Sequence, residues 1–307
     1  MNRSFDDKQN DFEKMWHFVE MVNREKKDDF TWQVCRLGDW KFGLWNEKKL
    51  IPSFSRKNAQ LWFGEKNQLV GFVLSEDGGN VIFIFTIKKY EFLYSELLDW
   101  TIENWGPKFS TLILEIREGQ RDLITILEQK GFQSKGIIAT TRSYDLSSKV
   151  SETINLPAGF RIVNMLENKD YHSKDMLAIN AFENQNQISD FDLIKFEYSR
   201  ENPAYDPIFD FSVITQDGVH VASCVGLLDK INKTSEIEKV CTHQQYRRLG
   251  LSEAVIKHCF QKLFSKGFNR AYITAYGKEA DQLYEKLGPC NRQHWLHYEI
   301  ILGSIRK

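Results

Sequence analysis

The chain of 307 residues is about twice the length of a common domain, and its 42% hydrophobic and 13% aromatic residues suffice for two cores. This composition excludes a disordered chain, a collagen-like repeat and a small disulfide-stapled fold. A formal net charge of -1, from 41 basic and 42 acidic residues, gives no support for a nucleic acid or an anionic membrane as partner.

The five cysteines lie far apart, with no CxxC spacing and no pair of histidines at metal-ligand distance, so we expect reduced thiols and no metal site. The first ten residues are polar and charged, unlike a signal peptide. No stretch reaches the roughly 18 apolar residues that a membrane helix needs. We therefore expect a cytoplasmic protein.

The first half predicts strands and helices in a definite order. Apolar residues at steps of three and four predict a helix over 12–22, which the charged run 24–29 ends. Four short runs predict strands, the last three joined by turn residues as an antiparallel meander, at 32–37, 60–63, 69–74 and 81–86. Helices and strands then alternate, at 91–105 (helix), 111–116 (strand), up to 130 (helix) and up to 145 (strand).

A polar connector at 147–157 precedes a second run of elements. This run begins with a strand and two helices at 160–164, 171–181 and 191–198. A meander of three strands follows, at 209–215, 219–227 and 235–242. It ends with a helix, a strand, a helix and terminal strand segments, at 251–266, 271–275, 279–287 and up to 302.

The two halves repeat one order of elements at an offset of 157 residues. Residues 126–131 fall on 283–288, at a helix end with an apolar face and a glycine cap in both halves. A short match of this kind is common, but the shared order of the surrounding elements is not. We therefore expect two related α/β domains at residues 1–148 and 156–307.

The most informative segment is a tight basic turn between a predicted strand and a helix. Apolar residues recur every four positions from Leu251 to Leu263, so the helix is buried along one stripe and its start is fixed in space. A helix start presents unpaired N–H groups and a partial positive charge, and Gly250 lets a ligand approach the main chain. Such a turn suits a diphosphate, to which Arg247 and Arg248 add positive charge.

This segment resembles the acyl-CoA-binding motif of the GNAT acetyltransferase superfamily, Gln/Arg-x-x-Gly-x-Gly/Ala. Arg247, Gly250 and Ser252 take its three defined positions, with a serine where the family prefers glycine or alanine. The resemblance implies that acetyl-CoA is the acyl donor, bound by the turn and by backbone pairing of its pantetheine arm with the preceding strand. The residues it assigns to this binding are Val240, Cys241, Thr242, Arg247, Arg248, Leu249, Gly250, Leu251 and Ser252.

Residues 280–288 resemble the family's Ala-x-x-Leu-Tyr-x-x-x-Gly helix, whose tyrosine often lies by the CoA sulfur. A phenol can protonate the departing thiolate or donate a hydrogen bond to it, so the resemblance implies Tyr284 as the acid. The acceptor amine must also lose a proton. Glu236 and Glu238 lie on one side of a strand unless a bulge interrupts it, and they are the candidate bases, with a water chain as the alternative.

The C-terminal segment offers Trp295, His297 and Tyr298 as candidates to line an acceptor pocket, although alternate aromatic residues in a terminal strand are more typical of core and rim. His243, next to the basic turn, is interpreted as a solvated or hydrogen-bonding loop residue. Cys241 is rejected as an acyl carrier because no base is recognisable near it.

The first half lacks the residues that carry this chemistry. Its equivalent turn, at 90–95, has no glycine and no arginine, and it contains Glu91, which would repel a diphosphate. Leu127 takes the position of Tyr284. The half therefore resembles a degenerate GNAT domain that folds without binding CoA in the same way.

The sequence is identified as a tandem GNAT-like α/β protein, with each domain a mixed, mostly antiparallel sheet flanked by helices. The resemblance implies that the second domain transfers an acetyl group from acetyl-CoA directly to a primary amine of a small molecule or peptide. Two alternatives remain, a non-catalytic acyl-CoA-binding module and a tandem aminoacyl transferase that uses charged tRNA, a class that normally lacks the Arg-x-x-Gly turn. The acceptor, the acyl-chain preference and the choice between monomer and homodimer stay open.

Overall fold

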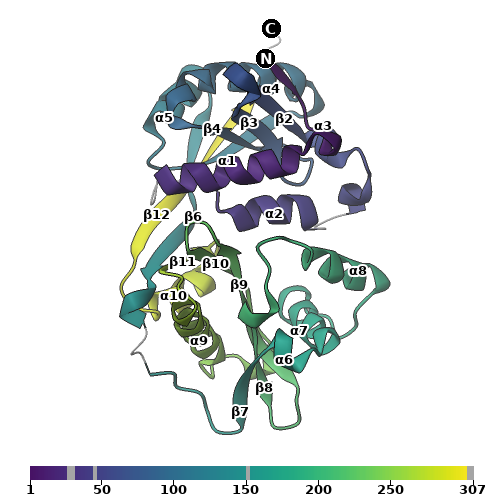
Figure 1. Ribbon diagram of the computed structural model, residues 1–307, viewed down its shortest axis with the longest axis vertical. Helices are drawn as coiled ribbons and strands as arrows, with labels where there is room; N and C mark the ends of the chain where they lie inside the picture. The colour runs from purple at the N-terminus through teal and green to yellow at the C-terminus, as the bar shows by residue number, and fades with distance from the viewer. Residues whose placement is uncertain (26–31, 44–46, 150–152, 303–307) are drawn as a thin grey trace. The chain divides into compact units, whose positions relative to one another are not determined.

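The computed structural model describes residues 1–25, 32–43, 47–149 and 153–302, which form two compact units (Figure 1). The first unit consists of Met1–Thr140 and Gln293–Lys307, and the second of Thr141–Arg292. Both contain a mixed sheet of mostly antiparallel strands with helices packed on it, which confirms the predicted fold class.

The first unit begins with a short strand and then follows the order of helices, meander and alternating elements. Its strands lie in the order β1-β2-β3-β4-β5-β12-β6, with β4 and β5 parallel and the pairs from β1 to β4 antiparallel. The elements are β1 (Asn2–Ser4), α1 (Asp11–Glu25), α2 (Val34–Phe42), α3 (Phe54–Asn58), β2 (Ala59–Phe63), β3 (Leu69–Ser75), β4 (Val81–Thr86), α4 (Tyr94–Asn104), β5 (Thr111–Arg117), α5 (Arg121–Gln129), β6 (Gln133–Asp145) and β12 (Asn291–Ile301).

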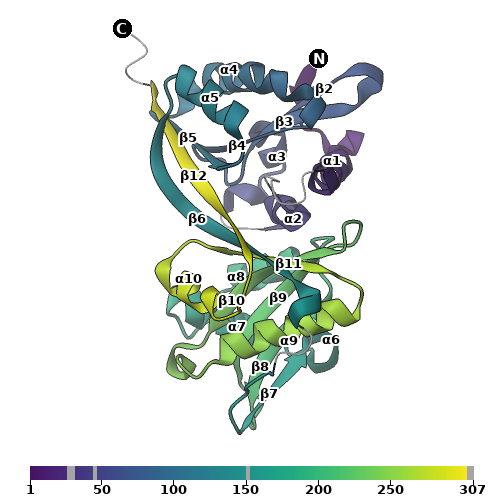
Figure 2. The same cartoon turned by 90° about the vertical axis from the view of Figure 1, so that its left-hand side faces the viewer.

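The second unit repeats this order. Its strands lie in the order β7-β8-β9-β10-β11-β6, and β10 and β11 are its parallel pair. Figure 2 shows α9 in front of the strands of this unit and α7 behind them. The elements are β7 (Phe160–Asn164), α6 (Met165–Asn168), α7 (Tyr171–Glu183), α8 (Asp190–Ser199), β8 (Asp210–Thr215), β9 (His220–Asp229), β10 (Thr234–Thr242), α9 (Leu251–Ser265), β11 (Arg270–Ala275) and α10 (Lys278–Glu285).

The last strand of the chain belongs to the first unit. β12 pairs antiparallel with β5, from Trp295 opposite Arg117 to Ile301 opposite Thr111, and it lies beside β6 (Figure 2). The second half of β6, residues 141–145, lies in the second unit next to β11. The predicted domains 1–148 and 156–307 placed β6 in the first domain and β12 in the second. In the structure β12 belongs mainly to the first unit, and residues 141–145 of β6 belong to the second.

The predicted strand at 32–37 is wrong, because these residues lead into helix α2. Its buried residues Val34, Leu37 and Trp40 recur every three positions, which suits one face of a helix. The offset of 157 residues carries this helix onto 191–199, the position of α8. The helix α1 ends at Glu25, and the rest of the charged run, 26–29, lies outside the described residues.

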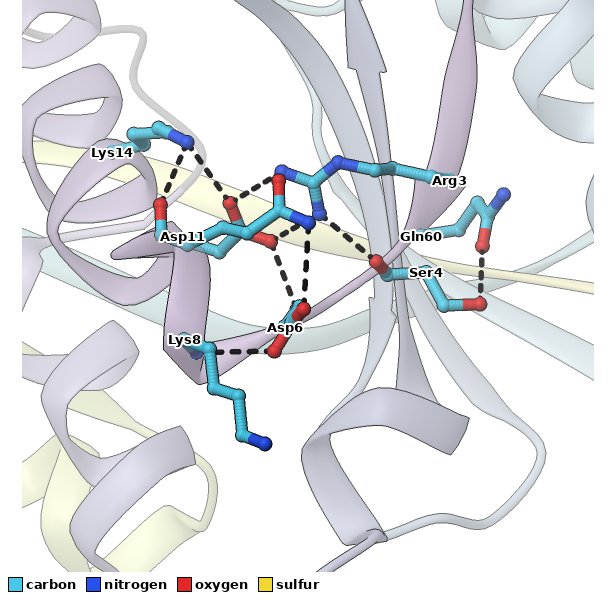
Figure 3. A network of polar contacts seen from close by, with 8 residues as sticks. Arg3, Ser4, Asp6, Lys8, Asp11, Lys14 and Gln60 are labelled. Carbon is cyan, nitrogen blue, oxygen red and sulfur yellow. Dashed lines mark hydrogen bonds and ion pairs between the residues drawn. The ribbon is translucent and has the colours of Figure 1, made fainter.

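A buried carboxylate fixes the N-terminal strand to α1 (Figure 3). Asp11 accepts hydrogen bonds from both terminal nitrogens of Arg3, at 2.5 and 2.8 Å, and from the backbone N–H of Asp6, at 2.9 Å. Burial by itself would raise the pKa of Asp11, but these bonds and one from Lys14 outweigh it and hold the pKa below its ordinary value. The carboxylate therefore stays charged and keeps β1 in place.

Candidate active site

The turn between β10 and α9 contains a glycine in a backbone conformation that suits this residue. Gly250 caps the start of α9 with φ 77°, in the left-handed region that favours glycine. A Cβ at this position would meet no atom within 4 Å, so the space in front of the main chain is open. The first N–H groups of α9 have no partner within the helix, as at every helix start.

Side chains from α7 hold this turn, a role that the sequence did not reveal. The backbone N–H of Gln244 donates to Asn180 Oδ1 at 3.1 Å, and its side chain donates to the carbonyl of Asn180 at 3.2 Å. Arg247, expected to supply charge for a phosphate, donates instead to the carbonyls of Ala181 at 3.2 Å and Thr242 at 3.5 Å. Arg247 thus ties the end of α7 to the turn.

The other residues of the turn divide between solvent and core. Arg248 is exposed and has φ 68°, a second left-handed position, and Leu249 is also exposed. Leu251 is buried and anchors the first turn of α9. The hydroxyl of Ser252 contacts Thr242 Oγ1, so Ser252 joins the helix to β10 and does not act as its cap.

A pocket of about 390 Å³ adjoins the start of α9. Leu249, Gly250, Glu253 and Lys257 line it together with the connector residues 155–157. Glu253 and Lys257 form an ion pair of 2.9 Å across one turn of the helix. The volume falls within the range of small-molecule sites.

The strands β10 and β11 diverge beside this turn. Their ladder runs only from Thr234 to Glu236, which lies opposite Tyr272, whereas β10 remains paired with β9 as far as Thr242. Residues 240–242, expected to pair with a pantetheine arm, therefore have one edge beyond the end of the β11 ladder. An extended ligand can add to such an edge through main-chain hydrogen bonds.

A β-bulge lies in β10 at the point of divergence. The register with β9 shifts between Glu238 and Cys241, and Lys239 has φ 51°, which is uncommon for a residue with a Cβ. Ile237 is buried in the core that α9 covers, and Val240 also packs against that core. The bulge therefore places Glu238 and Lys239 together on the opposite face, and the predicted alternation of Glu236 and Glu238 ends just before it.

Tyr284 lies on α10 and is 6% exposed. Burial raises the pKa of its phenol, and the negative charge of Glu238 raises it further. The phenol therefore keeps its proton throughout the neutral range. Among the other candidates, Glu238 is half-buried, and Glu236 is buried at the end of the β10–β11 ladder.

Three side chains near the end of the first half hold α10, and no sequence motif marked them. Tyr144 donates its hydroxyl hydrogen to the carbonyl of Tyr284 at 2.8 Å, and Lys149 donates to the carbonyl of Leu287 at 2.7 Å. Arg142 is fully buried and forms ion pairs of 2.8 and 2.7 Å with Asp281 and Glu285, one helical turn apart. These contacts fix the height and rotation of the helix that carries Tyr284.

The other residues that the sequence singled out pack in a core or form hydrogen bonds within the protein. Burial raises the pKa of Cys241, whose thiol contacts Ser223 Oγ at 3.2 Å. His243 Nδ1 accepts a hydrogen bond from the backbone of Gln245, as expected for a loop residue. Trp295 and Tyr298 are buried in the core of the first unit, so they do not belong to the unit that carries Tyr284.

Metal ligands and membrane spans are both absent from the part of the chain that the structure describes. Within it, no three or more His, Cys, Asp or Glu side chains group in a way that would hold a metal ion. Among the same residues, no helix combines the length and apolar character that a membrane span requires.

Comparison with known proteins places the second unit in a family. Residues 175–288 match the family described as "Acetyltransferase (GNAT) family". A GCN5-related N-acetyltransferase from Sphaerobacter thermophilus is 13% identical, with a TM-score of 0.63 over 98% of this chain and 95% of that one. A tandem GNAT protein from the clavulanic acid biosynthesis pathway is 10% identical, with a TM-score of 0.67 over 99% and 98%.

A GNAT-family acetyltransferase from Colwellia psychrerythraea is 10% identical, with a TM-score of 0.59 over 98% of this chain and 99% of that one. No curated protein matches the chain. At these identities the solved structures establish the fold. The chain therefore has the fold of GNAT proteins along its length, a tandem one among them, and its second unit contains a domain of the GNAT acetyltransferase family.

Proposed function

We propose that the second unit transfers an acetyl group from acetyl-CoA to the primary amine of a small molecule or peptide. The observation that carries this proposal is the divergence of β10 from β11 after Glu236, beside an open helix start at Gly250. A thioester carrier needs both features, because its diphosphate requires N–H donors and its pantetheine arm requires an unpaired strand edge.

The residues of the turn and strand fit such a carrier. The first N–H groups of α9 and the open space at Gly250 suit the diphosphate, and the pocket beside them suits the nucleotide end. The backbone of Val240, Cys241 and Thr242 would pair with the pantetheine arm, which leads toward the bulge. Arg248 is exposed beside the turn and is available to add charge.

The chemistry follows from Glu238 and Tyr284. Glu238 takes a proton from the acceptor ammonium, and the nitrogen lone pair forms a bond to the thioester carbon. The C–S bond breaks and CoA leaves as a thiolate. The nitrogen gives its second proton to solvent as the amide forms, and the proton on Glu238 also passes to solvent. The pKa of Tyr284 is raised above that of a thiol, so its hydroxyl stabilises the thiolate by a hydrogen bond and solvent supplies the final proton. Glu236, farther back on the strand, is the second candidate base.

Calorimetric titration with acetyl-CoA tests the binding step, with two glycine variants as a matched pair. Gly250 and Gly218 have φ 77° and 86°, and an added Cβ meets nothing within 4 Å at either position. Both alanine variants therefore carry the same backbone strain, of order 1 kcal/mol. We expect Gly250→Ala to weaken binding at least tenfold and Gly218→Ala to leave it unchanged. Absence of binding to the unmodified protein would refute the proposal.

A thiol-release assay with a panel of amines tests the transfer step. Acetyl transfer produces one free CoA thiol for each amide formed, and an acyl-CoA-binding module produces none. We expect thiol release that depends on the amine and rises with amine concentration. Tight binding of acetyl-CoA without release by any amine would favour the non-catalytic alternative.

A further inference from the structure

The bulge in β10 brings one acidic and one basic side chain to the same face of the strand. Alternation from Ile237 would place Lys239 on the face that α9 covers. The bulge reverses this, and Lys239 Nζ lies 3.0 Å from Ser199 Oγ, at the end of α8. Glu238 and Lys239 are therefore consecutive residues that both face away from α9.

The ammonium group of Lys239 has an unusual set of neighbours. Its hydrogen-bond partner is the neutral hydroxyl of Ser199, and no carboxylate of the described residues lies within ion-pair distance of it. Two other cations, Lys174 and Arg200, lie in the same region. The charges of Lys239 and Arg200 both lower the pKa of Lys174. Lys239 is thus a half-buried cation beside other cations.

The nearest carboxylates on α7 and β8 are already paired with other residues. Asp175 forms an ion pair with Arg200, whose guanidinium also lies 4.3 Å from the ring centroid of Tyr171. Asp210 forms an ion pair with Lys174 and accepts a hydrogen bond from a tyrosine hydroxyl. The charge of Lys239 also lowers the pKa of Asp175, so Asp175 attracts Lys239, but its ion-pair partner is Arg200. A half-buried ammonium whose hydrogen-bond partner is a neutral hydroxyl can still gain from a directly bound anionic ligand.

We propose that the acceptor amine carries an anionic group a few bonds from its nitrogen, and that Lys239 binds that group while Glu238 receives the ammonium. This inference rests on the acetyl transfer proposed above for the same site. An amino acid is the simplest acceptor of this kind, and a phosphorylated amine has the same charge pattern. Lys239 is then a specificity-determining residue and takes no part in bond making.

The backbone of Lys239 decides which variants test this role. Its φ of 51° strains most side chains, but asparagine tolerates the left-handed region well. Lys239→Asn therefore removes the charge and keeps the bulge, and Lys239→Arg keeps the charge. Both leave Glu238, Tyr284 and the turn at Gly250 unaltered.

The probes are matched pairs of amines that differ in one charge. We use the common amino acids with their amides, and O-phosphoethanolamine with ethanolamine. An amino acid amide has a less basic amine than its parent acid, so more of it is neutral and reactive at a given pH. A preference for the acid therefore cannot arise from amine reactivity.

We expect kcat/KM to be at least tenfold higher for the anionic member of the preferred pair. Lys239→Asn should remove this preference by lowering the value for the anionic amine alone, and Lys239→Arg should restore most of it. Preference within the amino acid pairs identifies a carboxylate, and preference within the phosphoethanolamine pair identifies a phosphate. Equal values within every pair, or an equal loss for both members in Lys239→Asn, would overturn the inference.

Binding is measured separately, by the thermal shift that each amine produces on the unmodified protein saturated with CoA. The anionic member should stabilise the protein and its neutral partner should not. If no amine releases thiol, the proposed transfer fails, yet selective stabilisation that disappears in Lys239→Asn would still support an anionic ligand at Lys239. If the two members of every pair stabilise equally or not at all, the inference about Lys239 fails even where transfer is observed.

Discussion

In both units the same pair of neighbouring strands separates after a short ladder, but the residues at that point differ. In the first unit β4 pairs with β5 only at Val81 and Ile82, and in the second unit β10 pairs with β11 only as far as Glu236. The open ladder is therefore a property of the repeated fold. It does not by itself mark a ligand site.

In the first unit, the protein's own side chains occupy the point of divergence. The guanidinium of Arg36 lies 4.8 Å from the ring centroid of Phe83 on β4 and 3.8 Å from Glu115 on β5. It also pairs with Glu76 at 3.0 Å and lies 5.0 Å from the ring of Trp32. An arginine thus bridges β4 and β5 in the first unit.

The connection to the following helix differs as well. In the first unit a 3-10 helix, Lys88–Leu93, joins β4 to α4, and none of its residues has a positive φ. In the second unit Arg248 and Gly250 both do. The comparison shows that one backbone order supports an open turn or a closed core, depending on a few residues at the strand end.

The largest effect is expected from Tyr284→Phe, which removes the hydroxyl that distinguishes the second unit from Leu127 of the first. We expect kcat to fall at least a hundredfold, because one acid or hydrogen-bond donor contributes about that factor, with little change in acetyl-CoA affinity. Tyr298→Phe is the control, since it removes a buried hydroxyl near Glu128 in the first unit and should leave kcat unaltered. A loss of kcat below threefold in Tyr284→Phe would remove Tyr284 from the mechanism.

Acid should destabilise the second unit before the first. Burial and the charge of Lys174 lower the pKa of His220 and outweigh the opposing charge of Asp170, so the pKa falls from 6.5 to about 4. A folded pKa below the unfolded value means that stability is full above pH 6.5 and is lost as the pH falls toward 4, by about 3 kcal/mol in total. In the first unit Asp11 keeps its stabilising charge until the pH falls through the carboxylate range.

Tryptophan fluorescence separates these two transitions, because all eight tryptophans fall within the residues of the first unit. In urea titrations between pH 7.5 and 4.5, circular dichroism follows both units and fluorescence follows the first. As the pH falls, the urea midpoint seen by circular dichroism should decrease before the midpoint seen by fluorescence. His220→Phe should reduce this difference. Coincident transitions at every pH would show that the two units unfold together.

Removal of Arg36 tests whether the first unit is held closed. Arg36→Met leaves the half-buried Glu115 without its cation, and we expect the first unit to lose about 2 kcal/mol. Tryptophan fluorescence in urea measures this loss, with the exposed Arg56→Met as control. Affinity for acetyl-CoA should not change. Binding of a second equivalent of acetyl-CoA by Arg36→Met would instead show that Arg36 alone blocks a latent site.

The smallest effect concerns the support of α10. Tyr144→Phe removes one hydrogen bond to the carbonyl of Tyr284, worth about 1 kcal/mol, and should lower kcat roughly fivefold through a less fixed helix. Acetyl-CoA affinity should remain the same, because the hydroxyl of Tyr144 donates to α10 and its removal leaves the backbone of the turn at Gly250 unaltered. An unchanged kcat would show that Arg142 and Lys149 hold the helix without Tyr144.

Most helices and strands followed from local patterns, because periods of two and of three to four residues record which side chains the core buries. The short elements β1, α3 and α6 were not predicted, and α2 was predicted wrongly as a strand. It has tryptophan and valine at alternate positions near its start, and only the repeat with α8 would have corrected the prediction. The terminal strands were beyond local patterns. A strand's sequence sets which face is buried, but its partner strand is chosen by the topology of the whole chain.

The sequence by itself determined most of the helices and strands, their repeated order and the glycine turn before α9, since each depends on neighbours in the chain. The tertiary structure alone decided that β12 completes the first unit, that Arg36 closes its strands, and that a bulge places Lys239 beside Glu238. These features arise from contacts between residues far apart in sequence, and from a backbone shift of one residue that no side-chain pattern records.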